Sequence, residues 1–148
     1  MIIKENTYEK VRTEINKSTD KNIIFSSNDD ELNRKILEKL KINILLLNLS
    51  NRKDKLKQRN SGLNQVLAKI AQKNRISIGI NLDEIIEEKN LIEKSKIISR
   101  LKQNIKLCNK NKLKIKFISQ KKENERNLHD LKSLGLVLGM PNWITKSL

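Results

Sequence analysis

The sequence has very few of the residues that build disulfide scaffolds and histidine-rich metal sites. It contains one cysteine and one histidine among 148 residues. The single cysteine, Cys108, cannot form an intrachain disulfide, which is typical of a protein in a reducing compartment. The single histidine, His129, cannot form a histidine-rich metal site by itself. Apolar stretches such as 44–47 are far shorter than the ~20 residues that span a bilayer, and the N-terminus has no signal-peptide pattern. We therefore expect a cytoplasmic protein without a membrane partner.

Acidic and aromatic residues are also scarce. The chain has 32 Lys and Arg against 17 Asp and Glu, which gives a net charge of +15 and a pI near 10.0. This excess favours a nucleic acid as partner, although an AT-rich genome could also enrich Lys, Asn and Ile. The only aromatic residues are Tyr8, Phe25, Phe117 and Trp143. Because proteins that stack single-stranded bases usually need more aromatic side chains, we expect recognition of phosphates and shape in folded RNA.

Apolar spacing predicts alternating strands and helices along the chain. We expect strands at 2–4, 22–25, 43–49, 75–81, 112–119 and 136–138. We expect helices around 8–15, 32–40, 63–71, 82–88, 97–108 and 128–134, the last of them ended by Gly135. The run 43–49 is apolar without alternation, which is typical of a strand buried on both faces of a parallel sheet. No linker, repeat or low-complexity segment divides the chain.

This alternation predicts an α/β fold with a largely parallel sheet and crossover helices. A TIM-barrel-like (β/α) fold is the natural closed form, but a full barrel typically needs ~200 or more residues. We therefore predict one domain, residues 1–148, with an abbreviated or incompletely closed barrel. A doubly wound sheet is the structural alternative.

The first basic stretch, residues 51–60, follows the predicted strand 43–49 and holds five basic residues and one acid. In α/β folds ligands bind at the carboxyl ends of the strands. The stretch leads into a helix that Asn60 or Ser61 could cap, and Gly62 would let a ligand approach the backbone. Free N–H groups there, with Arg52 and Arg59 nearby, predict an anion site. The alternative is a solvated basic loop with an ordinary helix cap.

The second basic stretch, residues 106–122, contains seven lysines and no acid. Lys112, Lys114 and Lys116 alternate with apolar residues and would share one strand face, which is either open to a partner or part of a lysine-rich edge strand. If the strands are parallel, Ser119 and Arg126 lie on the same rim as Arg59. Both could instead be loop-capping residues.

Catalysis by the chain itself has little support in the sequence. There is no Gly-rich phosphate loop. Cys108 lies on an apolar helix face, where it is more often a small buried side chain. Glu87 and Glu88 are best interpreted as solvated helix charges, and no three-ligand metal pattern is present.

The residues from Asn51-Arg52-Lys53 through Arg59-Asn60-Ser61-Gly62-Leu63-Asn64-Gln65-Val66-Leu67-Ala68-Lys69 resemble archaeal ribonuclease P protein component 3, a relative of the eukaryotic thirty-kilodalton subunit. The strand Ile76-Ser77-Ile78-Gly79-Ile80 and the later Ser119, Arg126, Asp130-Leu131 and 134–140 also match the family's blocks in order. The likeness runs from about 43 to 140. Gln65 stands where many members have His, and the chain resembles a shortened member.

The resemblance implies a TIM-barrel-like fold related to the polymerase and histidinol phosphatase phosphoesterases. It implies a non-catalytic subunit of ribonuclease P, in which the RNA uses Mg²⁺ to remove the 5′ leader of precursor tRNA and the protein binds no cofactor. The implied partners are ribonuclease P RNA, precursor tRNA, a small protein subunit of RNA-recognition-like fold and other protein subunits. The residues that would contact RNA or partner are Arg52, Lys53, Lys55, Lys57, Arg59, Asn60, Ser61, Gly62, Ser119, Lys121, Lys122 and Arg126. The alternatives are a divergent metal-dependent phosphoesterase of the same superfamily and a general structured-RNA-binding protein.

Overall fold

The computed structural model describes residues 1–148 and contains one sheet of five parallel strands in the order β1-β2-β3-β4-β5. The strands are β1 (Ile2–Ile3), β2 (Ile24–Ser26), β3 (Ile44–Leu47), β4 (Ser77–Asn81) and β5 (Ile115–Ile118). Strand order that follows chain order is that of a (β/α) barrel, whereas a doubly wound sheet reverses its order. Because β1 and β5 do not pair, the sheet is open. The prediction of a parallel, incompletely closed barrel-like fold is confirmed.

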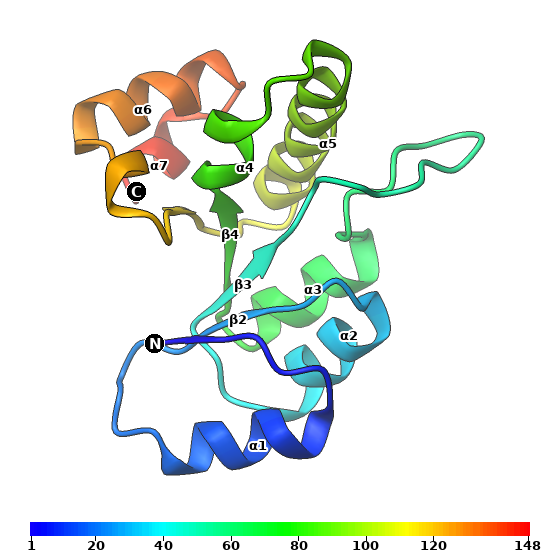
Figure 1. Cartoon of the computed structure of the whole chain (residues 1–148), viewed down its shortest axis with the longest axis vertical. Coiled ribbons are helices and arrows are strands. Elements are labelled where there is room, and N and C mark those ends of the chain that lie inside the picture. The colour runs from blue at the N-terminus through cyan, green and yellow to red at the C-terminus, as the bar shows by residue number, and fades with distance from the viewer.

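Helices follow every strand of the sheet (Figure 1). They are α1 (Tyr8–Lys17), α2 (Asp30–Lys39), α3 (Gln65–Lys73), α4 (Leu82–Glu87), α5 (Leu91–Lys110), a 3₁₀ turn η1 (Lys122–Asn124), α6 (Leu128–Val137) and α7 (Asn142–Thr145). Figure 1 shows α1, α2 and α3 beside the first half of the sheet and α4 to α7 beside the second half. None of these helices combines the length and apolar character needed to cross a membrane.

The asparagine-rich composition supplies many of the helix N-caps. Side chains of Asn64, Asn81, Asn90 and Asn127 accept hydrogen bonds from the first-turn N–H groups of α3, α4, α5 and α6, and Asp29 does the same for α2. An N-cap side chain satisfies an N–H group that has no partner within the helix. These caps fix where each helix begins, and so fix the length of the loop before it.

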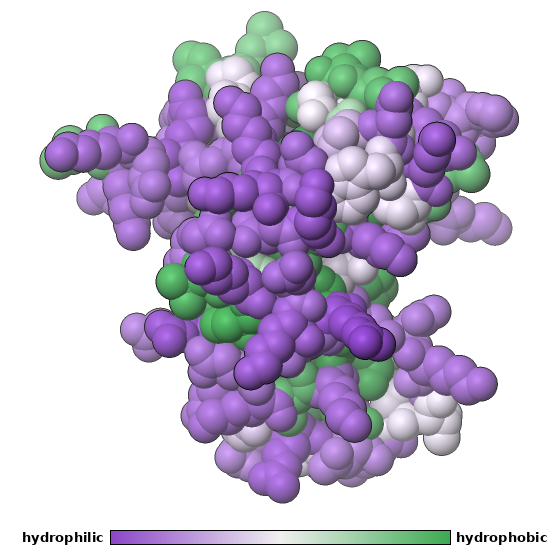
Figure 2. All heavy atoms as spheres, turned by 180° about the vertical axis from the view of Figure 1, so that it is seen from behind, coloured by the Kyte–Doolittle hydropathy of each residue, from purple (hydrophilic) through white to green (hydrophobic).

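The core lies between the sheet and its helices. Phe25, Leu45, Leu47, Ile78 and Ile80 alternate along the central strands and belong to one cluster of 27 buried apolar residues. On the opposite sheet face a Cβ at Gly79 would lie 2.9 Å from Ile44 Cγ2, so only glycine fits against the neighbouring strand there. Seen from behind, hydrophilic side chains cover most of the surface, with apolar atoms visible at the waist and at the top (Figure 2).

One predicted strand is wrong. Residues 136 and 137 form the end of α6, which continues past Gly135 to Val137, and Leu138 is its C-cap, whose N–H donates to Leu134 O. Gly135 lies buried inside this helix, where a Cβ would lie 2.9 Å from Met140 Sδ. The chain turns instead at Gly139, which has a φ of +94°. A three-residue apolar run fits a helix turn as well as a strand, so its periodicity could not separate them.

Candidate nucleic-acid interface

The longest loop of the fold connects β3 to α3 and contains the first basic stretch. We call residues 48–64 the β3–α3 loop, and residues 53–58, which project from the body of the molecule, the finger (Figure 1). Lys55 N–H donates to Gln58 O at 3.0 Å and closes the turn at its tip. The side chain of Leu56 is fully exposed there. Lys53, Lys55 and Lys57, which we call the finger lysines, are also exposed.

A buried arginine from α5 fixes the base of the finger. Arg100 is only 1% exposed, and it donates to Leu49 O at 2.8 Å, to Arg52 O at 2.7 Å and to Asp54 Oδ1 at 3.0 Å. The role of Arg100 was not predicted from the sequence. The signal that could have found it is its place on the apolar face of α5, between Ile97 and Leu101, where an arginine needs internal partners.

Arg52 serves the protein's own atoms. Its side chain is 8% exposed, its Nη1 lies 3.0 Å from Asp30 Oδ2 and 3.2 Å from Asn60 Oδ1, and its Nε donates to Asn48 O. Gly62 adopts a φ of +72°, and a Cβ there would lie 2.6 Å from Arg52 Nη2. These contacts give Arg52 a structural role within the protein. Nε and Nη1 of the guanidinium bind protein atoms and connect the loop to α2, whereas the buried Nη2 has no hydrogen-bond partner.

Asp54 is shared by two arginines, so its single negative charge offsets only one of their two positive charges. The hydrogen bond from Arg100 lowers the pKa of Asp54 below its usual value, and the Asn60 N–H and Arg59 guanidinium lower it further. Arg59 Nη1 lies 3.0 Å from Asp54 Oδ2 and its side chain remains 44% exposed. Arg59 can therefore still meet a partner, whereas Asp54 cannot offset the charge of the finger lysines as well.

The start of α3 lies beside the base of the finger. Asn64 caps the helix by accepting from Leu67 N–H at 2.9 Å, so the expected cap by Asn60 or Ser61 is wrong. Ser61 is instead buried, and its carbonyl accepts from Asn104 Nδ2. A cavity of about 430 Å³ lies between the loop, α3 and α5. Its cationic lining side chains are Lys55, Arg59 and Lys110.

Gln65, at the position where the resembled family often carries His, has a structural contact. Its Nε2 donates to Asn111 Oδ1 at 2.7 Å and joins the first turn of α3 to the end of α5. The same amide also lines the cavity beside the finger.

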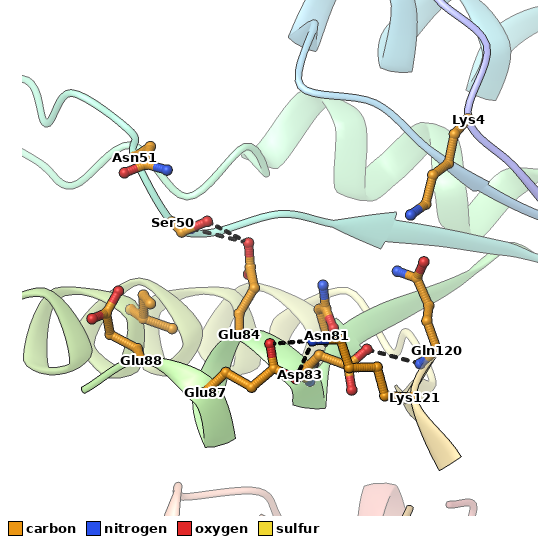
Figure 3. A pocket seen from close by; sticks show the side chains of 11 residues that line it. Lys4, Ser50, Asn51, Asn81, Asp83, Glu84, Glu87, Glu88, Gln120 and Lys121 are labelled. Atoms are coloured by element: carbon orange, nitrogen blue, oxygen red, sulfur yellow. Dashed lines mark hydrogen bonds and ion pairs between the residues drawn. The ribbon is translucent and has the colours of Figure 1, made fainter. Parts of the chain in front are cut away.

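A second cavity, of about 440 Å³, opens at the carboxyl ends of the strands and is drawn in Figure 3. Its acidic side chains come from α4 and the residue after it, and Lys4 and Lys121 are its two lysines. Glu84 accepts from the Leu49 N–H at 2.8 Å and from Ser50 Oγ at 2.6 Å, as the dashed lines in Figure 3 show for Ser50. Glu84 therefore ties α4 to the beginning of the β3–α3 loop.

The other α4 carboxylates hold the loop that follows β5. Asp83 accepts from Ser119 Oγ and Gln120 N–H at 2.8 Å each and from Asn124 Nδ2 at 2.9 Å. Burial by itself would raise the pKa of Asp83, but these hydrogen bonds outweigh it and hold the pKa below its usual value. Glu87 is exposed, as expected of a solvated helix charge, and it also pairs with Lys121 at 2.6 Å, a contact that lowers its pKa.

The predicted contact residues after β5 differ in whether they bind α4. Ser119 and Lys121 hold the loop after β5 to α4. Lys122 and Arg126 are exposed, and Arg126 donates to two carbonyls of its own loop, Glu123 O and Glu125 O. Several predicted residues of the β3–α3 loop line the cavity beside α5, whereas Lys121 alone of the predicted residues after β5 lines the cavity beside α4. Neither cavity contains both Arg59 and Ser119.

The predicted lysine face of the second basic stretch is partly covered by the C-terminal residues. Lys116 Nζ donates to Ser147 O, and Lys112 Nζ lies 5.6 Å from the centre of the Trp143 ring. Lys114 stays exposed. No group of three or more His, Cys, Asp and Glu side chains is close enough to hold a metal ion.

Comparison with known proteins gives relatives of one kind. Ribonuclease P protein component 3 of Methanococcus vannielii is 32% identical over 88 residues, which are 60% of this chain and 35% of that protein. The protein of the same name from Methanococcus maripaludis strain C6 is 27% identical over 126 residues, 85% of this chain and 50% of that protein. The chain is related to ribonuclease P protein component 3. It spans between a third and a half of the length of these two relatives, and no family model matches it.

The structural comparison finds a solved chain of the same fold. A chain from a cryo-EM structure of archaeal ribonuclease P with mature tRNA superposes with a TM-score of 0.77 at 22% identity. The match covers 98% of this chain and 62% of the other. At this identity the match establishes a shared fold, and the resemblance deduced from residues 43–140 is confirmed by the curated relatives.

Proposed function

We propose that the chain is a protein subunit of ribonuclease P that binds and supports the catalytic RNA during removal of the 5′ leader from precursor tRNA. The observation that carries this proposal is the distribution of charge in the β3–α3 loop of a component 3 relative. Both arginines and the acid of the loop are paired with protein atoms, while the finger lysines project without an acidic partner. Unpaired surface lysines attract phosphates and release their counterions on binding.

In this proposal the protein performs no bond cleavage. Its lysines reduce the repulsion between RNA phosphates that must pack together, and so lower the Mg²⁺ concentration at which the RNA adopts its active shape. The RNA supplies the Mg²⁺ chemistry, and the protein binds no cofactor of its own. The proposed partners are ribonuclease P RNA, precursor tRNA, the small subunit of RNA-recognition-like fold and the other protein subunits, all in the cytoplasm.

Of the twelve residues predicted from the sequence, we retain as proposed contacts those with exposed, available side chains. These are Lys53, Lys55, Lys57, Arg59, Lys122 and Arg126. The residues that the structure uses as supports are Arg52, Asn60, Ser61, Gly62, Ser119 and Lys121.

Reconstitution tests the proposal. Ribonuclease P RNA and the remaining protein subunits from the same organism are assembled with and without this chain, and cleavage of precursor tRNA is followed across a Mg²⁺ titration. We expect omission to shift the midpoint to higher Mg²⁺. Unchanged cleavage at low Mg²⁺ without the chain would refute the proposal. Turnover of a phosphoester by the purified chain in the absence of RNA would favour the phosphoesterase alternative instead.

A further inference from the structure

The tip of the finger combines an apolar side chain with unpaired positive charge. Leu56 is fully exposed between Lys55 and Lys57. The one acid of the finger, Asp54, faces away toward Arg100 and Arg59. A single exposed leucine is unremarkable by itself. What distinguishes this leucine is that it stands at the end of a projecting, cationic segment.

The finger is also held rigidly at its base. Arg100 reaches three points of the β3–α3 loop from the buried face of α5, and Arg52 joins the loop to Asp30 of α2. On the other side, Glu84 fixes the Leu49 N–H. A segment that is already fixed loses less conformational entropy when it binds a partner. The fold therefore presents the tip in a defined direction.

We propose that the finger enters the minor groove of a double-helical segment of the RNA, with Lys55 and Lys57 contacting phosphates and Leu56 packing on riboses and base edges. This inference rests on the proposed function and adds to it the segment that makes the contact and the surface it meets. A-form RNA has a wide, shallow minor groove that side chains can enter, whereas its major groove is too deep and narrow. The positive charge of the tip favours RNA over an apolar protein partner.

A chemical probe attached at the tip tests the position of the finger directly. The only native thiol, Cys108, is completely buried, so a Leu56→Cys variant has one accessible thiol for a tethered iron-EDTA group. In the reconstituted holoenzyme we expect strand cleavage at nucleotides that face each other across one minor groove. The matched control is Lys39→Cys, an exposed position at the end of α2, which should cleave different nucleotides or none.

Binding measurements separate the contributions of charge and of the leucine. Affinity for ribonuclease P RNA falls as salt rises, and Lys55→Gln/Lys57→Gln should make the negative slope of log affinity against log salt shallower by about 2. The control pair Lys39→Gln/Lys41→Gln removes the same charge from exposed positions before β3 and should leave the slope nearly unchanged. Leu56→Ala should weaken binding by about tenfold without changing the slope, because it removes only apolar contact. All these side chains are exposed, so thermal melts of the variants should match the parent.

The outcomes separate this inference from the proposed function. If the parent chain binds the RNA and supports cleavage, but the lysine pair keeps the parental slope and the tip probe cleaves no RNA, the finger inference is wrong and the proposed function stands. If a crosslinker attached to Leu56→Cys in the holoenzyme captured another protein subunit and no RNA, the inference would also be wrong. If the parent chain neither binds ribonuclease P RNA nor supports cleavage, both fail.

Discussion

Replacing Arg100 by methionine should loosen the base of the finger and destabilise the whole protein. Methionine keeps most of the aliphatic volume of the side chain, but it removes the donors to Leu49 O, Arg52 O and Asp54. Breaking a buried charged pair typically costs about 3–5 kcal/mol. Because Asp54 is 25% exposed and can recover some hydration, we place the loss near the lower end, at about 3 kcal/mol. For a chain of this length that corresponds to a fall in Tm of roughly 6–12 °C.

The assay is urea unfolding, with native-state hydrogen exchange as a local readout. Arg34→Met is the matched control, because Arg34 is 60% exposed and pairs only with Glu38 four residues along α2. An exposed pair of this kind contributes about 0.3–0.5 kcal/mol. The Lys55 amide, which donates to Gln58 O, should exchange faster in Arg100→Met than in the control. Equal urea midpoints of unfolding for the two variants would show that the hydrogen bonds of Arg100 do not stabilise the loop.

Three further predictions concern Gly62, Asp83 and Cys108. Gly62→Ala should cost at least about 1 kcal/mol more than Gly139→Ala in urea unfolding, because both have positive φ but only the Gly62 Cβ would displace the Arg52 guanidinium; equal costs would contradict the packed joint. The lowered pKa of Asp83 means that its ionised form stabilises the fold above its usual value of 3.8 and that this contribution disappears as the pH falls below it. Asp83→Asn should therefore flatten the loss of unfolding free energy between about pH 5 and pH 3, and a slope equal to the parent's would count against its role. Burial raises the pKa of the Cys108 thiol to about 12, so it should resist thiol reagents at pH 8 until urea unfolds the chain; rapid labelling of the folded protein would show that it is accessible.

The alternation of strands and helices could be predicted because periodicity and apolar runs report burial locally. The run 43–49, apolar at almost every position, predicts a strand covered on both faces, and β3 occupies its centre. Sequential parallel pairing then follows from the spacing of the crossovers. Periodicity does not resolve a run of three residues, and 136–138 became the last turn and C-cap of α6, with Gly135 buried in that helix rather than ending it.

The location of the candidate interface could also be predicted, because a loop after a buried parallel strand must lie at the carboxyl rim. Which charges stay free could not. Arg100 and Asp54 are 46 residues apart, and Asp83 and Gln120 are 37 apart. No local pattern shows that α4 carboxylates face the loop after β5, so the pairing of the exposed Glu87 with Lys121 could not be predicted. A charged residue on an apolar helix face, as at Arg100, is the one signal that would have pointed to such a partner.

The two kinds of cation in the β3–α3 loop have different environments, and this difference bears on the origin of the net charge. A lysine-rich composition imposed by an AT-rich genome would place lysine wherever a cation is tolerated. Yet the positions that need several directed hydrogen bonds hold arginine, namely Arg52 and Arg100, which suits a planar guanidinium with donors in a fixed geometry. The finger lysines occupy the positions that no protein atom requires, where a hydrated point charge stays available for phosphate. Arg52 and Arg100 thus fix the shape of this loop, while the finger lysines supply its unpaired charge. Exchanging Arg100 for lysine would keep the net charge and still lose the fixed guanidinium geometry on which the three hydrogen bonds depend.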